Sequence, residues 1–258
     1  MTHTLQFPDL LRLIDDRSNA FRAALASAPG LDLPVPTCPG WTLADLAQHL
    51  GEGRRKWAAI VAAGPADAPP ARSGWESTAP QDREALLDWW TESTRQLLDA
   101  LREAGPDRGC WTWWGRSQSP QTTGAAARHQ LQEIAVHTYD AQVTVGSPQP
   151  LPEEVALDGV EEFQVTCCAT TAAWPHEPAV VDYHATEGRS WRLWLSAGGA
   201  RVAPLPPTAD GADAADASAR LTASDLVLFF YGRIPPESLE LDGDKRVFDR
   251  LIAWDPDA

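Results

Sequence analysis

The sequence predicts an α+β protein, with a larger helical part followed by a smaller part that contains strands. Two observations predict this class. Up to about residue 175 apolar residues recur at the three- and four-residue spacing of amphipathic helices, and beyond residue 178 they alternate as in strands. Trp174-Pro175 separates the two patterns, because proline cannot continue a helix. We therefore expect one domain over residues 1–175 and a second over residues 176–258.

The helices of the first part are expected where apolar stripes lie between start and stop signals. Pro29-Gly30 stops the first helix, and Gly105 lies near the end of the third. Thr42 can cap the second helix, with Asp45 three residues later as its capping-box partner. The expected helices cover residues 8–28, 42–63, 86–105 and 122–145, and a fifth covers residues 153–173.

The second part is expected to form a small sheet with helices. Glu187-Gly188 and Gly198-Gly199 are turn signals between three alternating runs, at residues 180–185, 191–195 and 200–203. These runs predict an antiparallel meander. The stretch 204–217, rich in Pro, Ala and Asp, is interpreted as a solvated loop. The remaining elements are expected as a strand at 219–221, a helix at 225–231, a strand near 239–241 and a helix near 245–253.

Composition excludes several classes of protein. The net charge of −15 and the pI of about 4.7 leave no basic surface for nucleic acid. The four cysteines form no CxxC pair, so we interpret them as reduced thiols in a cytoplasm. The N-terminus has neither a basic nor an apolar leader region, and the longest apolar run, Trp57–Ala63, is too short to cross a bilayer. We therefore expect a cytoplasmic protein without a membrane partner.

Three side chains carry most of the functional information. Glu133 and His137 are four residues apart, so on one helix both leave the same face about one turn apart. His49 lies 84 positions upstream (133 − 49), where it interrupts the apolar face of the second helix. A carboxylate and two imidazoles from two helices would form a three-ligand site with an open position, the arrangement of catalytic zinc.

Spacing alone leaves a simpler interpretation open. A Glu and a His at this spacing are often an exposed helix pair, and a buried histidine such as His49 is often only hydrogen-bonded. His129 lies on the same face, but it is eight residues from His137. That separation is roughly 12 Å along the helix axis, so the two cannot share one ion.

Several segments together resemble the mycothiol-dependent maleylpyruvate isomerase family, within the wider DinB-like group. The resemblance covers nearly the whole chain. It is carried by Thr37-Cys38-Pro39-Gly40-Trp41-Thr42 with the residues up to Leu50, by Glu133–Asp140, by Leu157–Phe163, by Ser224-Asp225-Leu226, by Tyr231-Gly232-Arg233 and by Asp242-Gly243-Asp244.

The resemblance implies an N-terminal DinB-like four-helix bundle that holds a metal ion, and a smaller α/β sterol-carrier-like C-terminal domain. The metal ligands of the family map onto His49, Glu133 and His137, with zinc as the expected ion. It also implies mycothiol as the thiol cosubstrate. In the isomerase that names the family, the thiolate would add to a cis double bond, allow rotation and leave to give the trans product. Metal-activated water is the rival use of such a site.

Two further polar residues, Asp140 and Arg233, are candidates for supporting a metal ligand and for binding the substrate. Asp140, three residues after His137, could orient the imidazole, although a cap or surface role is an alternative. The family is thought to use an arginine of the C-terminal domain, and Arg233 could take that catalytic role by binding a substrate carboxylate. A surface role for Arg233 is the alternative.

The tryptophans Trp111, Trp113 and Trp114 are interpreted as a loop or short extended piece packed over the bundle, and a ligand-pocket wall is the alternative. Three functions remain possible at this point: a zinc- and mycothiol-dependent isomerase or S-transferase that acts on a small electrophile, a DinB-like hydrolase, or a non-catalytic protein that binds metal and an apolar ligand. The expected assembly is a monomer or a homodimer.

Overall fold

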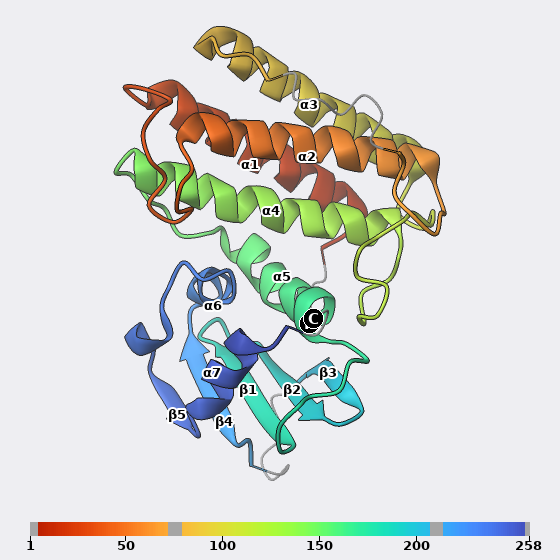
Figure 1. Cartoon of the computed structure of the whole chain (residues 1–258), viewed down its shortest axis with the longest axis vertical. Helices are drawn as coiled ribbons and strands as arrows, with labels where there is room; N and C mark the ends of the chain where they lie inside the picture. The colour runs from red at the N-terminus through yellow and green to blue at the C-terminus, as the bar shows by residue number, and fades with distance from the viewer. Residues whose placement is uncertain (1–4, 72–78, 207–213, 256–258) are drawn as a thin grey trace. The chain divides into compact units, whose positions relative to one another are not determined.

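The computed structural model describes residues 5–71, 79–206 and 214–255, and the chain forms two compact units (Figure 1). The N-terminal unit comprises Met1–Trp113 and Gln121–Leu151, and the C-terminal unit comprises Trp114–Pro120 and Pro152–Ala258. In the described part of the chain, no helix combines the length and apolar character that crossing a membrane requires.

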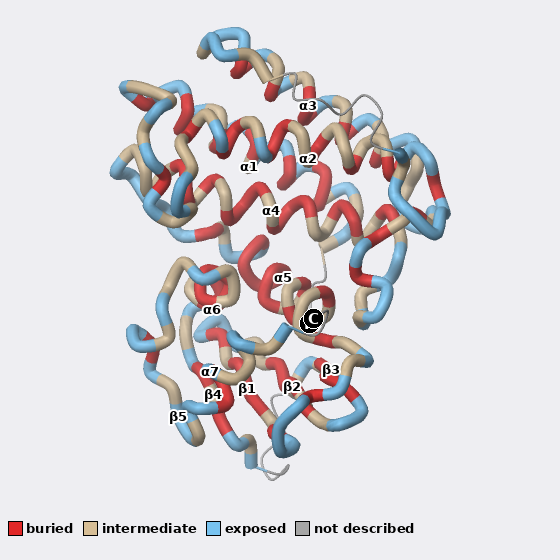
Figure 2. Tube along the Cα trace, viewed as in Figure 1, coloured by how far each residue is buried: buried red, intermediate tan, exposed pale blue. Residues whose placement is uncertain are grey.

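The N-terminal unit is a bundle of four long helices, as predicted. They are α1 (Phe7–Ser27), α2 (Leu43–Ala63), α3 (Arg83–Ala104) and α4 (Thr123–Thr144). Packing is concentrated in two pairs, α2 with α3 and α1 with α4. Buried residues recur along the helices of this unit (Figure 2), and large side chains such as Phe21, Leu46 and Trp90 are almost fully enclosed. The apolar periodicity of the sequence therefore builds the core that it predicts.

The predicted capping box starts α2. The Thr42 hydroxyl accepts the backbone N–H of Asp45 at 3.2 Å, and the Asp45 carboxylate accepts the N–H of Thr42 at 2.8 Å. We expect Thr42→Ala to lower the free energy of unfolding by about 1 kcal/mol. The backbone N–H of Asp45 loses its acceptor, and the reciprocal contact to the Asp45 carboxylate loses the hydroxyl that aligns it. Urea unfolding monitored by circular dichroism would measure the loss. Thr42→Ser keeps the hydroxyl, and an equal loss for Ser and Ala would contradict the capping explanation.

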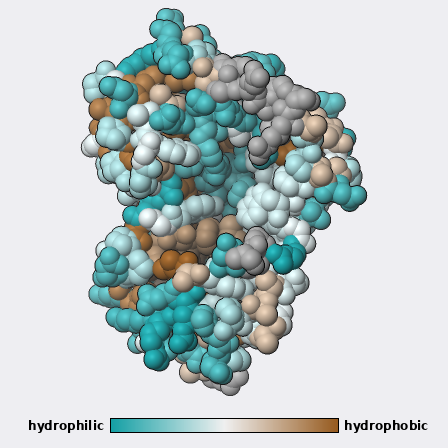
Figure 3. Space-filling view, viewed as in Figure 1, coloured by the Kyte–Doolittle hydropathy of each residue, from teal (hydrophilic) through white to brown (hydrophobic). Residues whose placement is uncertain are grey.

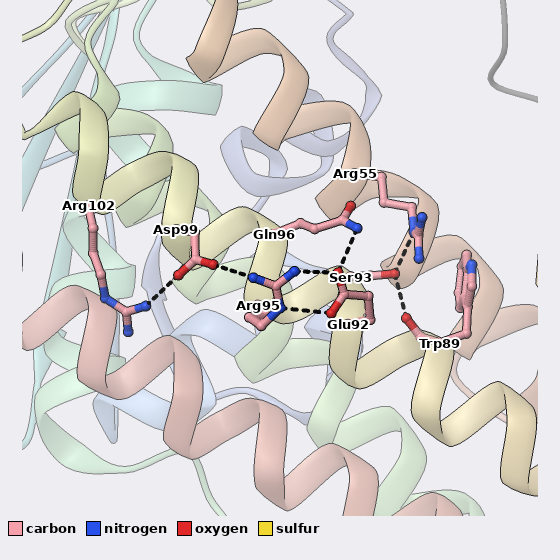
Figure 4. A network of polar contacts seen from close by, with 8 residues as sticks. All are labelled: Arg55, Trp89, Glu92, Ser93, Arg95, Gln96, Asp99 and Arg102. Atoms are coloured by element: carbon pink, nitrogen blue, oxygen red, sulfur yellow. Dashed lines mark hydrogen bonds and ion pairs between the residues drawn. The ribbon is translucent and has the colours of Figure 1, made fainter.

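A polar network also runs along α3 and reaches α2 (Figure 4). Arg55 of α2 donates to the Ser93 hydroxyl at 2.7 Å, and its guanidinium lies over the Trp89 ring at 5.0 Å. Along α3, Arg95 contacts Glu92 at 2.6 Å and Asp99 at 2.7 Å. These charges are largely exposed, so we assign them to the solvated side of the α2–α3 pair rather than to a site.

The C-terminal unit is a five-stranded mixed sheet with helices. Its strand order is β3-β2-β1-β4-β5, in which β1, β2 and β3 form the predicted antiparallel meander and β4 pairs parallel to β1. Arg192 and Asp182 face each other across β1 and β2 as a buried ion pair with contacts of 2.7 and 2.8 Å. The strands are Ala179–Ala185 (β1), Ser190–Ser196 (β2), Gly199–Pro204 (β3), Ala217–Leu221 (β4) and Leu241–Gly243 (β5), and the helices are Glu153–Phe163 (α5), Ala223–Phe230 (α6), Pro236–Ser238 (η2, 3-10) and Arg246–Ala253 (α7).

The fifth helix is shorter than predicted. Regular α-helix ends at Phe163, and one wider π-helical turn (η1, Gln164–Cys168) follows it. Thr170 then exchanges backbone hydrogen bonds with Ala200 of β3, and this pairing draws the chain away from the helix axis. The last strand also begins later than expected, at Leu241, after the 3-10 turn.

The division between the compact units differs from the boundary that we predict at residue 175. It falls at Leu151 and Pro152, because α5 packs on α6 and thus belongs with the sheet rather than with the bundle. The helical pattern of α5 predicts its type of structure but carries no signal for the unit it joins.

Candidate metal centre

The three predicted ligands converge between α2 and α4. Nε2 of His49 lies 3.0 Å from Oε1 of Glu133, and Nε2 of His137 lies 3.6 Å from the same oxygen. One potential ligand atom from each of the three lies within 4.8 Å of the other two. The side chains are 42% (His49), 28% (Glu133) and 12% (His137) exposed, so the cluster lies at the edge of the bundle with its His49 side open to solvent.

A fully buried carboxylate lies behind His137. Oδ2 of Asp140 is 2.8 Å from Nδ1 of His137. Because a carboxylate only accepts, this contact favours the proton on Nδ1 and leaves the lone pair of Nε2 for the Glu133 side of the ring. Asp140 therefore orients the imidazole, one of the two roles left open by the sequence.

A turn before α2 brings two more side chains to the cluster. The Cys38 carbonyl accepts the N–H of Trp41 at 3.1 Å, and Gly40 between them has a φ of 85°. Proline followed by glycine with positive φ is what a type II turn requires. The turn lets the Cys38 thiol donate to Asp140 at 3.4 Å, and it places the Trp41 ring 4.8 Å from the His49 ring and 6.4 Å from the His137 ring.

The sequence did not predict the roles of Cys38 and Trp41, which enter there only as part of the segment that resembles the family. The Cys38–Asp140 hydrogen bond joins residues 102 positions apart. The only local signal was the Pro-Gly turn directly before a capped helix that carries a histidine on its apolar face.

Neighbouring groups shift the pKa values of Glu133 and Arg54. Burial by itself would raise the pKa of Glu133, but the hydrogen bond from His49 and the nearby His137 and His129 imidazoles hold it down at about 2. A buried arginine, Arg54, lies close enough to be attracted by Glu133; burial lowers its pKa to about 9 while that attraction opposes the change. The carboxylate thus remains ionised.

His129 lies apart from the three ligands, in agreement with its exclusion as a partner of His137. Its ring centroid is 6.2 Å from that of Trp57 and 5.7 Å from that of Trp113, both in edge-on geometry. Trp113 is 48% exposed, whereas Trp114 is buried and its indole N–H donates to the Pro120 carbonyl at 3.2 Å. The tryptophan block forms a loop, and its members divide between packing and an exposed aromatic surface beside α4.

Arg233 belongs to the C-terminal unit, in the turn that ends α6. Its backbone N–H donates to the Leu228 carbonyl at 2.7 Å, and its guanidinium Nη1 donates to the Tyr231 carbonyl at 2.6 Å. The side chain is half-buried. Its predicted catalytic role stays a prediction.

The donor set of the cluster fits a divalent metal ion. Two imidazoles and one carboxylate form the His₂Glu combination of catalytic zinc sites, which leaves one coordination position open. The Asp140 contact supplies the carboxylate that commonly supports a ligating histidine. An alternative donor set, Cys38, His137 and Asp140, also brings its ligand atoms within 4.8 Å of one another. There, however, Asp140 already occupies the Nδ1 side of His137 and accepts from Cys38, which satisfies the groups without an ion.

The support from Asp140 can be tested separately from the ligands. We expect Asp140→Asn to weaken zinc binding by about 10-fold and Asp140→Ala by about 100-fold, because the imidazole loses first the charge and then the acceptor that orient it. Competition with a chromophoric chelator would measure both affinities. Asp45→Asn, at the exposed cap of α2, is the control; equal weakening in all three variants would contradict a specific role for Asp140.

Comparison with known proteins identifies the family of both units. The chain matches the family model of the mycothiol maleylpyruvate isomerase N-terminal domain over residues 11–142 and that of the MDMPI C-terminal domain over residues 154–250. No match was found among curated proteins.

Two solved structures share the fold. They are those of the mycothiol-dependent maleylpyruvate isomerase and of a histidine-to-alanine mutant of that enzyme; each has a TM-score of 0.59 at 15% sequence identity and covers 89% of this chain and 90% of its own. Because the two family models together span both units, the chain belongs to the mycothiol-dependent maleylpyruvate isomerase family.

Proposed function

We propose that the protein is a zinc-dependent enzyme that uses mycothiol either to isomerise a small electrophilic substrate or, as an S-transferase, to conjugate the thiol to it. The convergence of His49, Glu133 and His137 on one point, with Asp140 behind His137, is the observation that carries this proposal. The family membership and the shared fold support it.

The three side chains would hold the ion, each in a defined state. Glu133 stays ionised, His137 presents Nε2 because Asp140 accepts at Nδ1, and His49 contributes Nε2 from the exposed side. When bound, zinc favours the thiolate form of a thiol at its open position, which makes the sulfur nucleophilic at neutral pH.

Arg233 would act on the substrate rather than on the ion. The Trp41 ring lies beside the cluster, with its centroid 4.8 Å from that of His49 and 6.4 Å from that of His137. In the C-terminal unit, the Arg233 guanidinium would bind a substrate carboxylate through its planar fork. For this it would have to exchange its present hydrogen bond to the Tyr231 carbonyl for the substrate.

Turnover of zinc-loaded protein on a panel of electrophiles, with and without mycothiol, tests the proposal. We expect turnover only with mycothiol. Equal rates without any thiol would replace the proposal with a hydrolase that activates water at the same position. A protein that bound metal tightly but turned over no electrophile with either nucleophile would favour a non-catalytic binding role.

The role of Arg233 has its own expected result. Arg233→Ala should raise KM for a carboxylate-bearing electrophile by about 10-fold or more while the zinc content stays unchanged, because a charged hydrogen-bonding partner is lost only from the substrate. Arg233→Lys should recover part of the effect. Steady-state kinetics on an electrophile without a carboxylate provides the control, and an equal change in KM there would contradict recognition of the carboxylate.

A further inference from the structure

A cavity of about 480 Å³ lies within the C-terminal unit. Its walls come from the end of α5 and the π-helical turn, from β1, from the end of α6 and the turn after it, and from α7 with the residues that follow. The aromatic residues Phe163, Tyr183, Phe230, Phe248 and Trp254 contribute to these walls. A cavity of this volume matches the sites that bind small molecules.

The aromatic walls are arranged around one another rather than as isolated rings. Phe163 and Phe230 are stacked with centroids 5.0 Å apart, and Tyr183 meets Phe230 edge-on, also at 5.0 Å. Phe248 meets Tyr183 edge-on at 6.1 Å. A further ring among these aromatic side chains could gain offset or edge-to-face contacts as well as apolar burial.

The lining offers no charge to a ligand. All residues that line the cavity are apolar, glycine, proline, cysteine or tyrosine. Burial raises the pKa of the Cys168 thiol to about 12 and raises the pKa of the Tyr183 hydroxyl well above its usual range, so both stay neutral at physiological pH. An ion entering the cavity would lose its hydration without a compensating partner, which is strongly unfavourable.

The mouth of the cavity exposes apolar surface to solvent. Ile252 on α7 lines the cavity and is 63% exposed, the more exposed of the two large apolar side chains that are exposed in the described part of the chain. Figure 3 shows hydrophobic atoms at the surface of the C-terminal unit in the region of α6 and α7. Apolar surface therefore continues from the lining of the cavity to the exposed side chain of Ile252.

The wall at Cys167 and Cys168 contains the one π-helical turn of the described chain. A π turn is wider than an α turn and is retained mostly where it serves a site. Here it interrupts α5 where the chain borders the cavity, and both cysteines of the turn contribute to the lining.

We propose that this cavity binds a small, uncharged apolar molecule that carries an aromatic ring. The site uses residues of the C-terminal unit alone, and it does not depend on the metal or the thiol chemistry proposed for the N-terminal unit.

Titration of the full-length protein with N-phenyl-1-naphthylamine, a neutral aromatic fluorophore, tests the proposal. We expect saturable binding at one site per chain. Ile252→Glu should weaken it by about 10-fold, because a carboxylate at the apolar mouth must stay hydrated. Ala253→Glu is the matched control: it adds the same charge to the neighbouring residue of α7, which is exposed and does not line the cavity, and its affinity should stay within about 2-fold of the unchanged protein because exposed charges act weakly.

A second measurement locates the probe. Cys167 lines the cavity, whereas Cys38 is a half-buried thiol of the N-terminal unit. Bound probe should slow alkylation of Cys167 by a maleimide, read by peptide mass spectrometry, and leave the rate at Cys38 unchanged. Absence of saturable binding, equal weakening by Ile252→Glu and Ala253→Glu, or equal protection of the two cysteines would overturn the proposal.

Discussion

Replacing His49 with alanine is expected to abolish both metal binding and thiol-dependent turnover. The variant removes one of three converging donors, and the ring that currently contacts Glu133 at 3.0 Å disappears with it. Because loss of a mere supporting residue already costs 10- to 100-fold, we expect the affinity for zinc to fall by more than about 100-fold. Elemental analysis after gel filtration and chelator competition would measure the change. Side-chain exposure of 42% makes a folding defect from this substitution small.

His129→Ala is the demanding control for this experiment. His129 lies on the same helix as Glu133 and helps to lower the pKa of that carboxylate. Its ring packs against Trp57 and Trp113 instead of reaching the cluster. The variant should retain its zinc. If His129→Ala lost zinc as completely as His49→Ala, or if the unchanged protein bound no divalent metal, the assignment of the three ligands would be wrong.

Trp90→Ala is expected to cause the largest loss of stability, about 3–5 kcal/mol in the free energy of unfolding of the helical bundle. Trp90 is 1% exposed, its ring lies 5.0 Å from that of Phe21, and the Arg54 guanidinium lies 4.5 Å above it. Truncation would leave a cavity and would also remove a cation–π contact from a buried arginine. Urea unfolding monitored by helical circular dichroism reports mainly on this unit, which contains the four longest helices.

Two variants separate packing from other causes. Trp90→Phe keeps an aromatic ring, and the indole N–H that it removes has no hydrogen-bond partner among the described residues, so the loss should be much smaller than for alanine. Trp89→Ala, at the neighbouring half-buried position over Arg55, should also cost less. A loss for Trp89→Ala as large as that for Trp90→Ala would contradict the assignment of Trp90 to the core.

The bundle was predictable because its signals are local. The apolar stripes, the Thr42–Asp45 capping box and the stop at Gly105 each lie within a few residues of the structure that they specify. The early end of α5 was not predictable from the sequence. After the π-helical turn the chain pairs at Thr170 with Ala200, which lies 30 positions away. Grouping of α5 with α6 is likewise a tertiary choice that helix periodicity does not encode.

The candidate site shows the same contrast. The spacing of Glu133 and His137 and the family resemblance predicted which side chains converge, and the structure brings those three together. Their role as metal ligands stays a prediction. Contacts from Cys38 to Asp140 and from Arg54 toward Glu133 connect distant segments and leave no periodic trace in the sequence.

The concentration of packing in two helix pairs would give a metal ion bound at the three residues a mechanical role as well. His49 belongs to the α2–α3 pair, and Glu133 and His137 belong to the α1–α4 pair. An ion held by all three would fasten one pair to the other and would close a chain segment of 84 residues, the separation of His49 from Glu133. Because the three ligands meet only in the folded bundle, the binding free energy of the ion would add to the stability of the folded state. Loss of the ion would then favour opening between the two helix pairs. The rate of amide hydrogen exchange in α2 and α4 would therefore report occupancy of the site without any substrate.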